Sequence, residues 1–429
     1  MRVLEPVMTD TVETVLEART ERTKRLLAMA SCDPLLALTL RIPLRLQNSP
    51  LVSGFFRHIV HQVKTLLNVN GQLETSPAGR CATFHVPQMS TKKLKQWAIF
   101  FEETHPLGAF IDADVITEKG PLKRHQLGHP LRVCYLCEAP ALHCQRARTH
   151  ADSVIDDYIL TRLKKTLHQA LFDSVIDALI DEVTLHPKFA LVTPYQSGRH
   201  HDMTITHFMA SIEALKPYIK QFIEVPIKDA HAETLKRIGQ AAEAAMFKAT
   251  HGVNTHKGAI FLFGWVLPFI THGIHTGQTL DEALQTMANV AKPTLMEELQ
   301  TAQKKPRTTG ETMFEQFGIQ GVRGEIMQAL KSIRAFNLHD FDRYQRLTAL
   351  MSVCDDTTLL KHHSLRTLKN VQQDTEALLD EWQLSTYHAL SERYLHAGIS
   401  PGGAADLYSV WTFLINVSSW LKPSLDASR

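Results

Sequence analysis

The sequence carries little net charge and has no apolar run long enough to cross a bilayer comfortably. Its 46 Lys and Arg residues nearly balance its 44 Asp and Glu residues, which leaves a formal net charge of +2. A charge this mild argues against nucleic acid or a membrane surface as a partner. The most apolar runs, Gly258–Thr271 and Leu407–Leu421, fall short of the roughly 20 residues that a spanning helix needs. We therefore expect no nucleic-acid partner and no membrane segment.

Internal repeats, low-complexity tracts and a secretory signal are also missing. The first 26 residues mix both charge signs without an apolar core, so we expect no export signal. Cysteine is scarce, with six in 429 residues, and Cys134, Cys137 and Cys144 crowd into one short stretch. Such crowding favours metal or redox chemistry over a disulfide framework. We expect a cytoplasmic protein.

The pattern of apolar residues changes near residue 150. Before it, helical spacing alternates with short strand-like runs at 35–42, 80–86 and 110–116. After it, an apolar residue at every fourth position from 155 to 183 predicts one long helix that ends near His186-Pro187. We predict a multidomain chain, with an α/β or α+β domain over 1–152 and a larger all-α domain over 153–429.

Further segments have helical or loop character. Residues 303–312, QKKPRTTGET, are predicted to be a loop. In the first domain, the helices are expected at 11–29, 53–67 and 92–104. In the second domain, they are expected at 204–223, 231–250, 257–274, 279–302, 311–317, 324–335, 340–354, 364–396 and 401–421.

Four polar, glycine-containing motifs interrupt the helices of the second domain. They are SGRHHDM at 197–203, Glu243 with NTHKG at 254–258, GIQGVRGE at 318–325, and SPGGAAD at 400–406. In the last motif, Ser400 suits an N-cap, while Gly402 and Gly403 let a ligand approach free N–H groups. Lys257 and Arg323 would add cations for the same anion. Each motif alone is more often an ordinary cap or turn, but four together favour a phosphate site.

These motifs resemble the triphosphoribosyl-dephospho-CoA synthases, over about residues 155–421. The signature G-x-x-A-E-x-x-M-x-x-A-T-x-G-V-N-T-H-K-G-x-I-F of that family is intact at 239–261. The elements G-x-R-G-E and S-P-G-G-x-A-D-L follow at 321–325 and 400–407. The resemblance implies that the 2′-hydroxyl of 3′-dephospho-CoA displaces adenine from ATP, and that the triphosphate stays on the product.

Such a reaction needs cations and N–H donors for the triphosphate, and a carboxylate to assist the hydroxyl. Asp202, Glu243, Asp356 and Asp406 are the candidate carboxylates for Mg²⁺ or for the base, and the sequence does not rank them. The predicted catalytic residues here are Glu243, Lys257, Asp356 and Asp406. The predicted nucleotide contacts are His200, Asp202, Asn254, Thr255, His256, Arg323, Gly324, Glu325, Ser400, Gly402 and Gly403.

The first domain, over about residues 15–150, resembles holo-citrate lyase synthase. Arg19 and Arg22 fit its R-x-E-R element, and Asp112 and Asp114 fit its D-x-D-V after His-Pro-Leu-Gly. The resemblance implies transfer of phosphoribosyl-dephospho-CoA to a serine of the apo acyl carrier subunit of citrate lyase, with release of pyrophosphate. On a strand, the two aspartates would share one face and could hold Mg²⁺ over the leaving group, as in nucleotidyl transfer. Solvated acids at a strand end are the plainer explanation.

A cysteine and histidine pattern closes the first domain. Cys134, Cys137, Cys144 and His150 are separated by two, six and five residues. This spacing allows a structural Zn²⁺ site, with His143 as a competing ligand. Three reduced cysteines packed in a small core are the alternative.

Together these observations predict a bifunctional, ATP-using transferase that makes the citrate lyase prosthetic group and attaches it. Several loop positions near 189–201 and 355–364 depart from the synthase pattern. One alternative is therefore that one or both domains are non-catalytic nucleotide-binding or interaction modules. Another is that the synthase serves a different acceptor, such as the malonate decarboxylase pathway.

Overall fold

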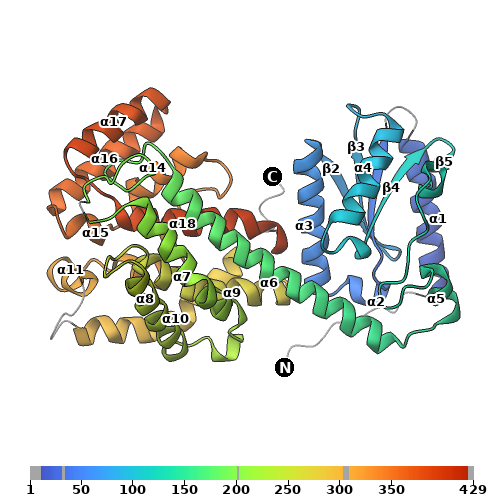
Figure 1. Ribbon diagram of the computed structural model, residues 1–429, viewed down its shortest axis with the longest axis horizontal. Helices are drawn as coiled ribbons and strands as arrows, with labels where there is room; N and C mark the ends of the chain where they lie inside the picture. Colours follow the sequence, from blue (N-terminus) through green and yellow to red (C-terminus); the bar gives the residue numbers. More distant parts are fainter. Residues whose placement is uncertain (1–10, 31–33, 201, 303–308, 424–429) are drawn as a thin grey trace. The chain divides into compact units, whose positions relative to one another are not determined.

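A computed structural model describes residues 11–30, 34–200, 202–302 and 309–423 (Figure 1). The chain forms two compact units, Met1–Leu167 and His168–Arg429. The helix α6, Asp152–Thr184, begins in the first unit and continues in the second. The domain boundary predicted at 152/153 stays a prediction.

The first unit is built on a five-stranded sheet in the order β2-β3-β1-β4-β5. Its strands are β1 (Leu35–Leu40), β2 (Gly71–Ser76), β3 (Gly79–His85), β4 (Ile111–Thr117) and β5 (Gly120–Pro121). Every neighbouring pair is antiparallel. Of the two classes that the sequence allowed, α+β is therefore the right one.

The helices of the first unit begin at residues that suit helix starts. They are α1 (Val12–Met29), α2 (Leu44–Gln47), α3 (Pro50–Leu67), α4 (Thr91–Thr104) and α5 (Ala141–Ala147), with 3₁₀ turns at Gly108–Phe110 and Arg124–Leu127. The side chains of Thr11, Ser49 and Ser90 accept hydrogen bonds from the first turns of α1, α3 and α4. In the sheet, β1 is buried at almost every position, because strands pair with it on both edges and helices cover it.

The described part of the second unit contains helices and no strand. After α6 come α7 (Ile205–Glu224), α8 (Ala232–Ala249), α9 (Lys257–Thr276), α10 (Leu280–Ala302), α11 (Thr309–Phe317), α12 (Gly321–Met327), α13 (Lys331–Arg334), α14 (Arg343–Val353), α15 (Thr357–Leu360), α16 (Leu365–Asp380), α17 (Leu384–His396) and α18 (Gly402–Val417). Two 3₁₀ turns lie at Ile227–Asp229 and Ser418–Trp420. The prediction of a larger all-α region is confirmed.

Three local predictions differ from the structure. The helix expected at 324–335 is split into α12 and α13, because Ala329 and Leu330 adopt positive φ values of 54° and 58°. The helix expected at 364–396 is split into α16 and α17. Residues 309–312 of the predicted loop are the start of α11, while 303–308 lie outside the described residues.

The helix α9 lies at the centre of the second unit. It packs against α7, α8, α10, α12 and α18 (Figure 1). By length and composition alone it could cross a membrane, but most of its side chains are buried inside the unit. Because α9 is fixed on several sides, its first turn is a rigid place on which to build a site.

Candidate functional site

Two carboxylates of the second unit lie directly against helix starts. A Cβ atom on Gly258, in the first turn of α9, would lie 2.0 Å from Oδ2 of Asp406. A Cβ atom on Gly403, in the first turn of α18, would lie 3.0 Å from the carboxyl carbon of Asp356. Both glycines are thus needed for close approach, since any side chain would displace the carboxylate.

Two further glycines join the same group of helix starts. A Cβ atom on Gly402 would lie 2.8 Å from Cγ2 of Thr358, and one on Gly321 would lie 2.8 Å from Cγ2 of Thr357. The contacts therefore connect the first turns of α9, α12, α15 and α18. We call this group the helix-start cluster, defined as Gly258, Gly321, Asp356, Thr357, Thr358, Gly402, Gly403 and Asp406. Three of the four motifs singled out in the sequence contribute to it.

Asp356 already satisfies the N–H groups that the sequence predicted to be free. Its Oδ2 accepts hydrogen bonds from the N–H groups of Gly403 at 2.9 Å and Ala404 at 3.1 Å. The N–H of Gly402 donates to the carbonyl oxygen of Ser400 at 3.0 Å. The expectation of unpaired donors at the start of α18 is therefore wrong for this structure, because a carboxylate of the chain takes the place foreseen for a phosphate.

Asp406 is the corresponding hydrogen-bond acceptor at the start of α9. It accepts a hydrogen bond from the N–H of Ala259. Burial raises the pKa of Asp406 well above its ordinary value, and the neighbouring carboxylates Glu182 and Asp356 raise it further. Burial likewise raises the pKa of Asp356. Both carboxylates thus have a tendency to keep a proton that ordinary surface aspartates lack.

A cleft of about 750 Å³ opens beside α8, α9, α10, α11 and α12. Its lining includes Glu243, Lys257 and Arg323. Nζ of Lys257 lies 2.8 Å from Oε2 of Glu243. Nη2 of Arg323 lies 3.6 Å from Oε1 of Glu311, and its guanidinium carbon lies 5.7 Å from the ring centre of Phe261. The cleft thus combines cationic side chains, acidic partners and an aromatic wall.

Lys257 connects the cleft to the helix-start cluster. It is the first residue of α9 and precedes Gly258, while its ammonium group faces Glu243 across the cleft. Asn254 fixes this start, because its Oδ1 accepts a hydrogen bond from the Lys257 N–H at 3.3 Å. Arg323 holds an equivalent position in the first turn of α12.

Other predicted contacts have structural partners instead. Glu325 is buried and accepts hydrogen bonds from the N–H and the hydroxyl of Ser332, which ties α12 to α13. Gly324 is buried in α12. His200 is partly buried and Asp202 is exposed in the loop before α7, and neither lines the cleft.

Four buried polar atoms of predicted site residues have no hydrogen-bond partner within the described residues. They are Oγ1 of Thr255, Nε2 of His256, Nε of Arg323 and Oγ of Ser400. The other ring nitrogen of His256, Nδ1, lies 2.7 Å from Oγ of Ser211. Burial lowers the pKa of His256 to about 3, with a smaller contribution from Lys188. His256 is therefore neutral at physiological pH.

Sequence reasoning missed a buried ion pair behind the cluster. Nζ of Lys188 lies 2.6 Å from Oε1 of Glu182, and both side chains are almost fully buried. Glu182 also raises the pKa of Asp406. The available signal was a lysine directly before the apolar segment 189–192, which implies a buried partner.

In the first unit, Asp112 and Asp114 lie on one face of β4, as the alternation of a strand requires. Oδ1 of Asp112 lies 2.9 Å from Nη2 of Arg132, and Oδ1 of Asp114 lies 3.2 Å from Nζ of Lys95. Burial raises the pKa of Asp112, and Asp114 raises it further. Each carboxylate is thus paired with a cation, and Arg132 also forms an ion pair with Glu102.

A cleft of about 1050 Å³ lies next to Asp112 and is rich in arginine. We call it the arginine cleft. Its arginines are Arg19, Arg22, Arg41, Arg45, Arg80 and Arg148. Within the residues that the structure describes, the guanidinium groups of Arg19, Arg41 and Arg148 make no hydrogen bond or ion pair. Unpaired cations in a cleft are suited to a polyanionic ligand.

Arg22 and Arg45 are already engaged with the chain itself. Arg22 is buried and donates to the carbonyl oxygens of Ala78 and Gly79, so it holds the turn between β2 and β3. Arg45 forms a two-pronged contact with Asp156, at 2.7 and 3.0 Å. The resemblance to holo-citrate lyase synthase suggested Arg19 and Arg22 as substrate-binding residues. Of these two, only the guanidinium group of Arg19 has no partner among the described residues.

The cysteines and the histidine at the end of the first unit come together. Sγ of Cys137 lies 3.4 Å from Sγ of Cys144 and 3.3 Å from Nε2 of His150, and Sγ of Cys134 lies 3.5 Å from the same nitrogen. All four ligand atoms lie within 4.8 Å of one another. Tetrahedral zinc with bonds of about 2.0–2.3 Å places its ligands about 3.5–3.8 Å apart, so the four side chains fit this ion.

The thiol of Cys134 has a lowered pKa, which favours metal binding. Burial acts to raise its pKa, but hydrogen bonds from the N–H groups of Leu136 and Cys137, together with those from the side chains of Cys144 and His150, lower the pKa to about 7. The thiolate is the form that binds metal, so this shift favours a bound cation.

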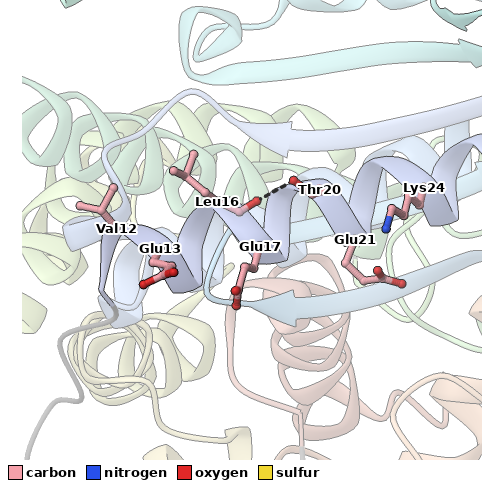
Figure 2. A pocket seen from close by; sticks show the side chains of 7 residues that line it. All are labelled: Val12, Glu13, Leu16, Glu17, Thr20, Glu21 and Lys24. Carbon is pink, nitrogen blue, oxygen red and sulfur yellow. Dashed lines mark hydrogen bonds between the residues drawn. The ribbon is translucent and has the colours of Figure 1, made fainter.

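Another hollow lies along the outer face of α1 and does not suit the predicted ligands. Figure 2 shows that its lining side chains all project from this one helix. Glu13, Glu17 and Glu21 among them would repel a phosphate. The two clefts described above are therefore the better candidates for nucleotide binding.

Comparison with protein families divides the chain in the same way as its two units. Residues 168–424 match the family described as ATP:dephospho-CoA triphosphoribosyl transferase. Residues 10–166 match the family described as apo-citrate lyase phosphoribosyl-dephospho-CoA transferase.

Individual relatives show the same combination. The chain is 30% identical to Protein CitXG of Haemophilus influenzae over 447 aligned residues, covering 94% of this chain and 96% of that one. It is 26% identical to Protein CitXG of Leuconostoc mesenteroides subsp. cremoris, covering 93% and 94%. The 2-(5''-triphosphoribosyl)-3'-dephosphocoenzyme-A synthase of Klebsiella pneumoniae is 30% identical over 292 residues, covering 62% of this chain and 96% of that enzyme.

Proposed function

This chain belongs to the ATP:dephospho-CoA triphosphoribosyl transferases, fused to an apo-citrate lyase phosphoribosyl-dephospho-CoA transferase, and we propose which residues carry its two activities. It is a bifunctional transferase that makes the prosthetic group of citrate lyase and attaches it. The substrates of the first reaction are ATP and 3′-dephospho-CoA, and adenine leaves. The acceptor of the second is the apo acyl carrier subunit of citrate lyase, and pyrophosphate leaves.

The synthase site is assigned to the cleft of the second unit and the adjoining helix-start cluster. The observation that carries this proposal is the position of Lys257, which belongs both to the cleft and to a helix start. The triphosphate of ATP would bind Lys257 and Arg323 in place of their present partners Glu243 and Glu311. The starts of α9 and α12 add favourable partial charges for an anion at this place.

Glu243 and Asp406 are the proposed base and acid. The hydroxyl oxygen of 3′-dephospho-CoA bonds to the ribose carbon of ATP as the bond from that carbon to adenine breaks. The hydroxyl proton passes to Glu243, whose carboxylate is free once Lys257 turns to the triphosphate. Asp406, whose pKa is raised well above its ordinary value, supplies the proton that adenine needs to leave. Carboxyl groups in unlike environments are suited to opposite roles in this way.

The transferase site is assigned to the arginine cleft. Arg19 and Arg41 would bind the phosphates of the triphosphoribosyl product. Asp112 borders the cleft and, with Asp114, would hold Mg²⁺ together with the triphosphate, because this ion prefers carboxylate and phosphate oxygens. When bound, Mg²⁺ neutralises charge on the pyrophosphate as it leaves. Lys95 and Arg132, released from the two aspartates, can then face that leaving group.

Two further assignments complete the proposal. The Cys134, Cys137, Cys144 and His150 group is proposed to hold a structural Zn²⁺, because its ligand atoms have the separations of a tetrahedral site. A cytoplasmic location is proposed, since these cysteines form a metal-type group with no disulfide.

Substitutions in the full chain separate the two sites. Lys257→Met should lower the rate of adenine release from ATP and 3′-dephospho-CoA by about 100-fold, as expected for loss of a charged contact to a reacting phosphate. Transfer of separately supplied triphosphoribosyl-dephospho-CoA should be unchanged. Asp112→Asn should show the reverse pattern, with loss of the mass shift on the apo acyl carrier subunit.

Lys236→Met is the matched control for the synthase site. Lys236 lines the same cleft and pairs with Glu298 at 2.9 Å, but it does not belong to a helix start of the cluster. We expect its adenine release to stay within about threefold of the unchanged chain, the range of an exposed ion pair. Equal losses in Lys236→Met and Lys257→Met would contradict the assigned role of Lys257.

A further inference from the structure

The backbone at Arg148 has a conformation that arginine does not favour. Arg148 follows α5 with φ 47° and ψ 46°, in the left-handed region. Its N–H donates to the carbonyl oxygen of Cys144, as in an ordinary left-handed helix cap. Glycine is the usual residue at such a cap, because a side chain there costs free energy.

The fold gives no reason for arginine at this position. The Arg148 side chain is exposed, and its guanidinium group makes no hydrogen bond or ion pair in the described part of the chain. Glycine would therefore form the same turn at lower cost. A strained backbone conformation that the fold does not require suggests that the side chain has a functional role.

The turn at Arg148 is enclosed by two of the four metal-type ligands. Cys144 lies four residues before it and His150 lies two residues after it. The turn brings Nε2 of His150 to 3.3 Å from Sγ of Cys137. An ion bound by these ligands would clamp both ends of the short segment that carries Arg148.

The same segment forms a wall of the arginine cleft. Cys144, Arg148 and His150 line this cleft together with Arg41 and Asp112. Arg148 is thus one of the unpaired guanidinium groups that face the ligand space. Cys137 completes the metal group without lining the cleft.

We propose that the zinc group holds Arg148 in place as an anion-binding residue of the transferase, so that zinc loading sets the affinity for the triphosphoribosyl substrate. This inference rests on the two assignments above, the Zn²⁺ site and the arginine cleft. Arg148 binds a phosphate group of the nucleotide, and the ion acts through Arg148 without touching substrate. Because this contact would hold the substrate equally in the ground state and in the transition state, its loss raises KM and leaves kcat unchanged.

The test uses the full chain and variants with distinct expected results. Cys137→Ser removes a ligand but leaves the cleft lining intact, so zinc content should fall and KM for triphosphoribosyl-dephospho-CoA should rise about tenfold. Arg148→Gly should raise KM equally while keeping zinc and a melting temperature at least as high as that of the unchanged chain. Arg148→Lys should recover part of the affinity, since it restores the charge but not the fork.

Two internal controls accompany these measurements. Adenine release by the second unit should be the same in all variants, which shows that each preparation is intact. The double variant Cys137→Ser with Arg148→Gly should have the KM of either single variant, because both changes remove one contact.

The outcomes separate the inference from the assignments on which it rests. Zinc loss in Cys137→Ser with unchanged KM would overturn the coupling and leave the metal site standing. An unchanged KM in Arg148→Gly would overturn the role of Arg148. A purified chain that contains no zinc and takes up none would overturn the metal site itself, and the inference with it.

Discussion

At the scale of single residues, the synthase site depends on glycines that make room for carboxylates. Gly258 and Gly403 each occupy a helix start where a methyl group would meet Asp406 or Asp356. Neither contact is with a flexible side-chain end that can move aside, because both carboxylates are held by backbone N–H groups. The glycines are therefore part of the site although they offer no side chain.

Gly258→Ala should destabilise the second unit and lower adenine release. Crowding in a packed site costs ~1–3 kcal/mol, more than the ~1 kcal/mol that alanine gains over glycine in a helix. Calorimetric melting of the full chain measures this as a lower transition temperature. Gly239→Ala in α8 is the control, because a Cβ atom there meets nothing within 4 Å. It should melt at the same temperature or higher, and an equal loss in both variants would refute the crowding argument.

At the scale of elements, the first turn of α9 determines the site. Asn254 caps it, Asp406 accepts from Ala259, and His256 directly before it is buried against Ser211. This arrangement joins three segments that are far apart in the sequence. A change in the charge of His256 would place a buried cation next to Lys188, which already lowers its pKa.

Stability should depend on pH through His256. Its pKa in the folded chain is about 3, below the ordinary value of 6.5, so only the unfolded chain takes up the proton between these values. The contribution of neutral His256 to the free energy of unfolding is complete above pH 6.5. It is lost as pH falls below this value, by about 1.4 kcal/mol per pH unit. Denaturant unfolding at pH 6.5 and 5.5 should show this loss in the unchanged chain. The His256→Asn variant has no titrating group at this position, so its free energy of unfolding should fall less over the same interval. Equal losses in the variant and in the unchanged chain would contradict the assigned role of His256.

The sequence predicted the long elements well and the short ones badly. The apolar stripe of α6 and the alternation of β4 identify these elements, because each follows a single period over many residues. The polar strand β2, the two-residue β5 and the short α15 carry no such period, so tertiary pairing alone defines them. The break between α16 and α17 reflects an apolar stripe that changes phase between Leu378 and Tyr387.

Prediction of the site residues was likewise only partly successful. Motifs with glycine, Lys257 and Arg323 were found because their residue types are suited to phosphate. The carboxylates that fill the helix starts were identified as residues, but not as partners of those N–H groups. The buried pair Glu182–Lys188 and the free Arg41 and Arg148 were missed, since only the folded chain shows which charges remain unpaired.

At the scale of the whole molecule, one chain carries the sites of two successive reactions, so the two sites are always present in equal numbers. Each compact unit contains its own cleft, and each cleft has its own set of cations. The product of the second unit is the substrate of the first. A tether between the two raises the concentration of the intermediate near the second active site.

Complementation in solution measures this advantage. A mixture of Lys257→Met and Asp112→Asn chains retains both activities, but on separate molecules. With ATP, 3′-dephospho-CoA and apo acyl carrier subunit, we expect the mixture to modify the carrier more slowly than the unchanged chain at low enzyme concentration. The difference should vanish when triphosphoribosyl-dephospho-CoA is supplied in excess. Equal rates at every concentration would show that the tether brings no benefit.

The carboxylates that face Lys257 and Arg323 also determine what nucleotide binding means energetically. Glu243 and Glu311 act as resident counter-ions, so the charges of the two cations are balanced before any substrate arrives. Arrival of a triphosphate is then an exchange of anions rather than the filling of an empty cationic hole. The energy of this exchange is a difference between two similar interactions, which allows the enzyme to release a highly charged product.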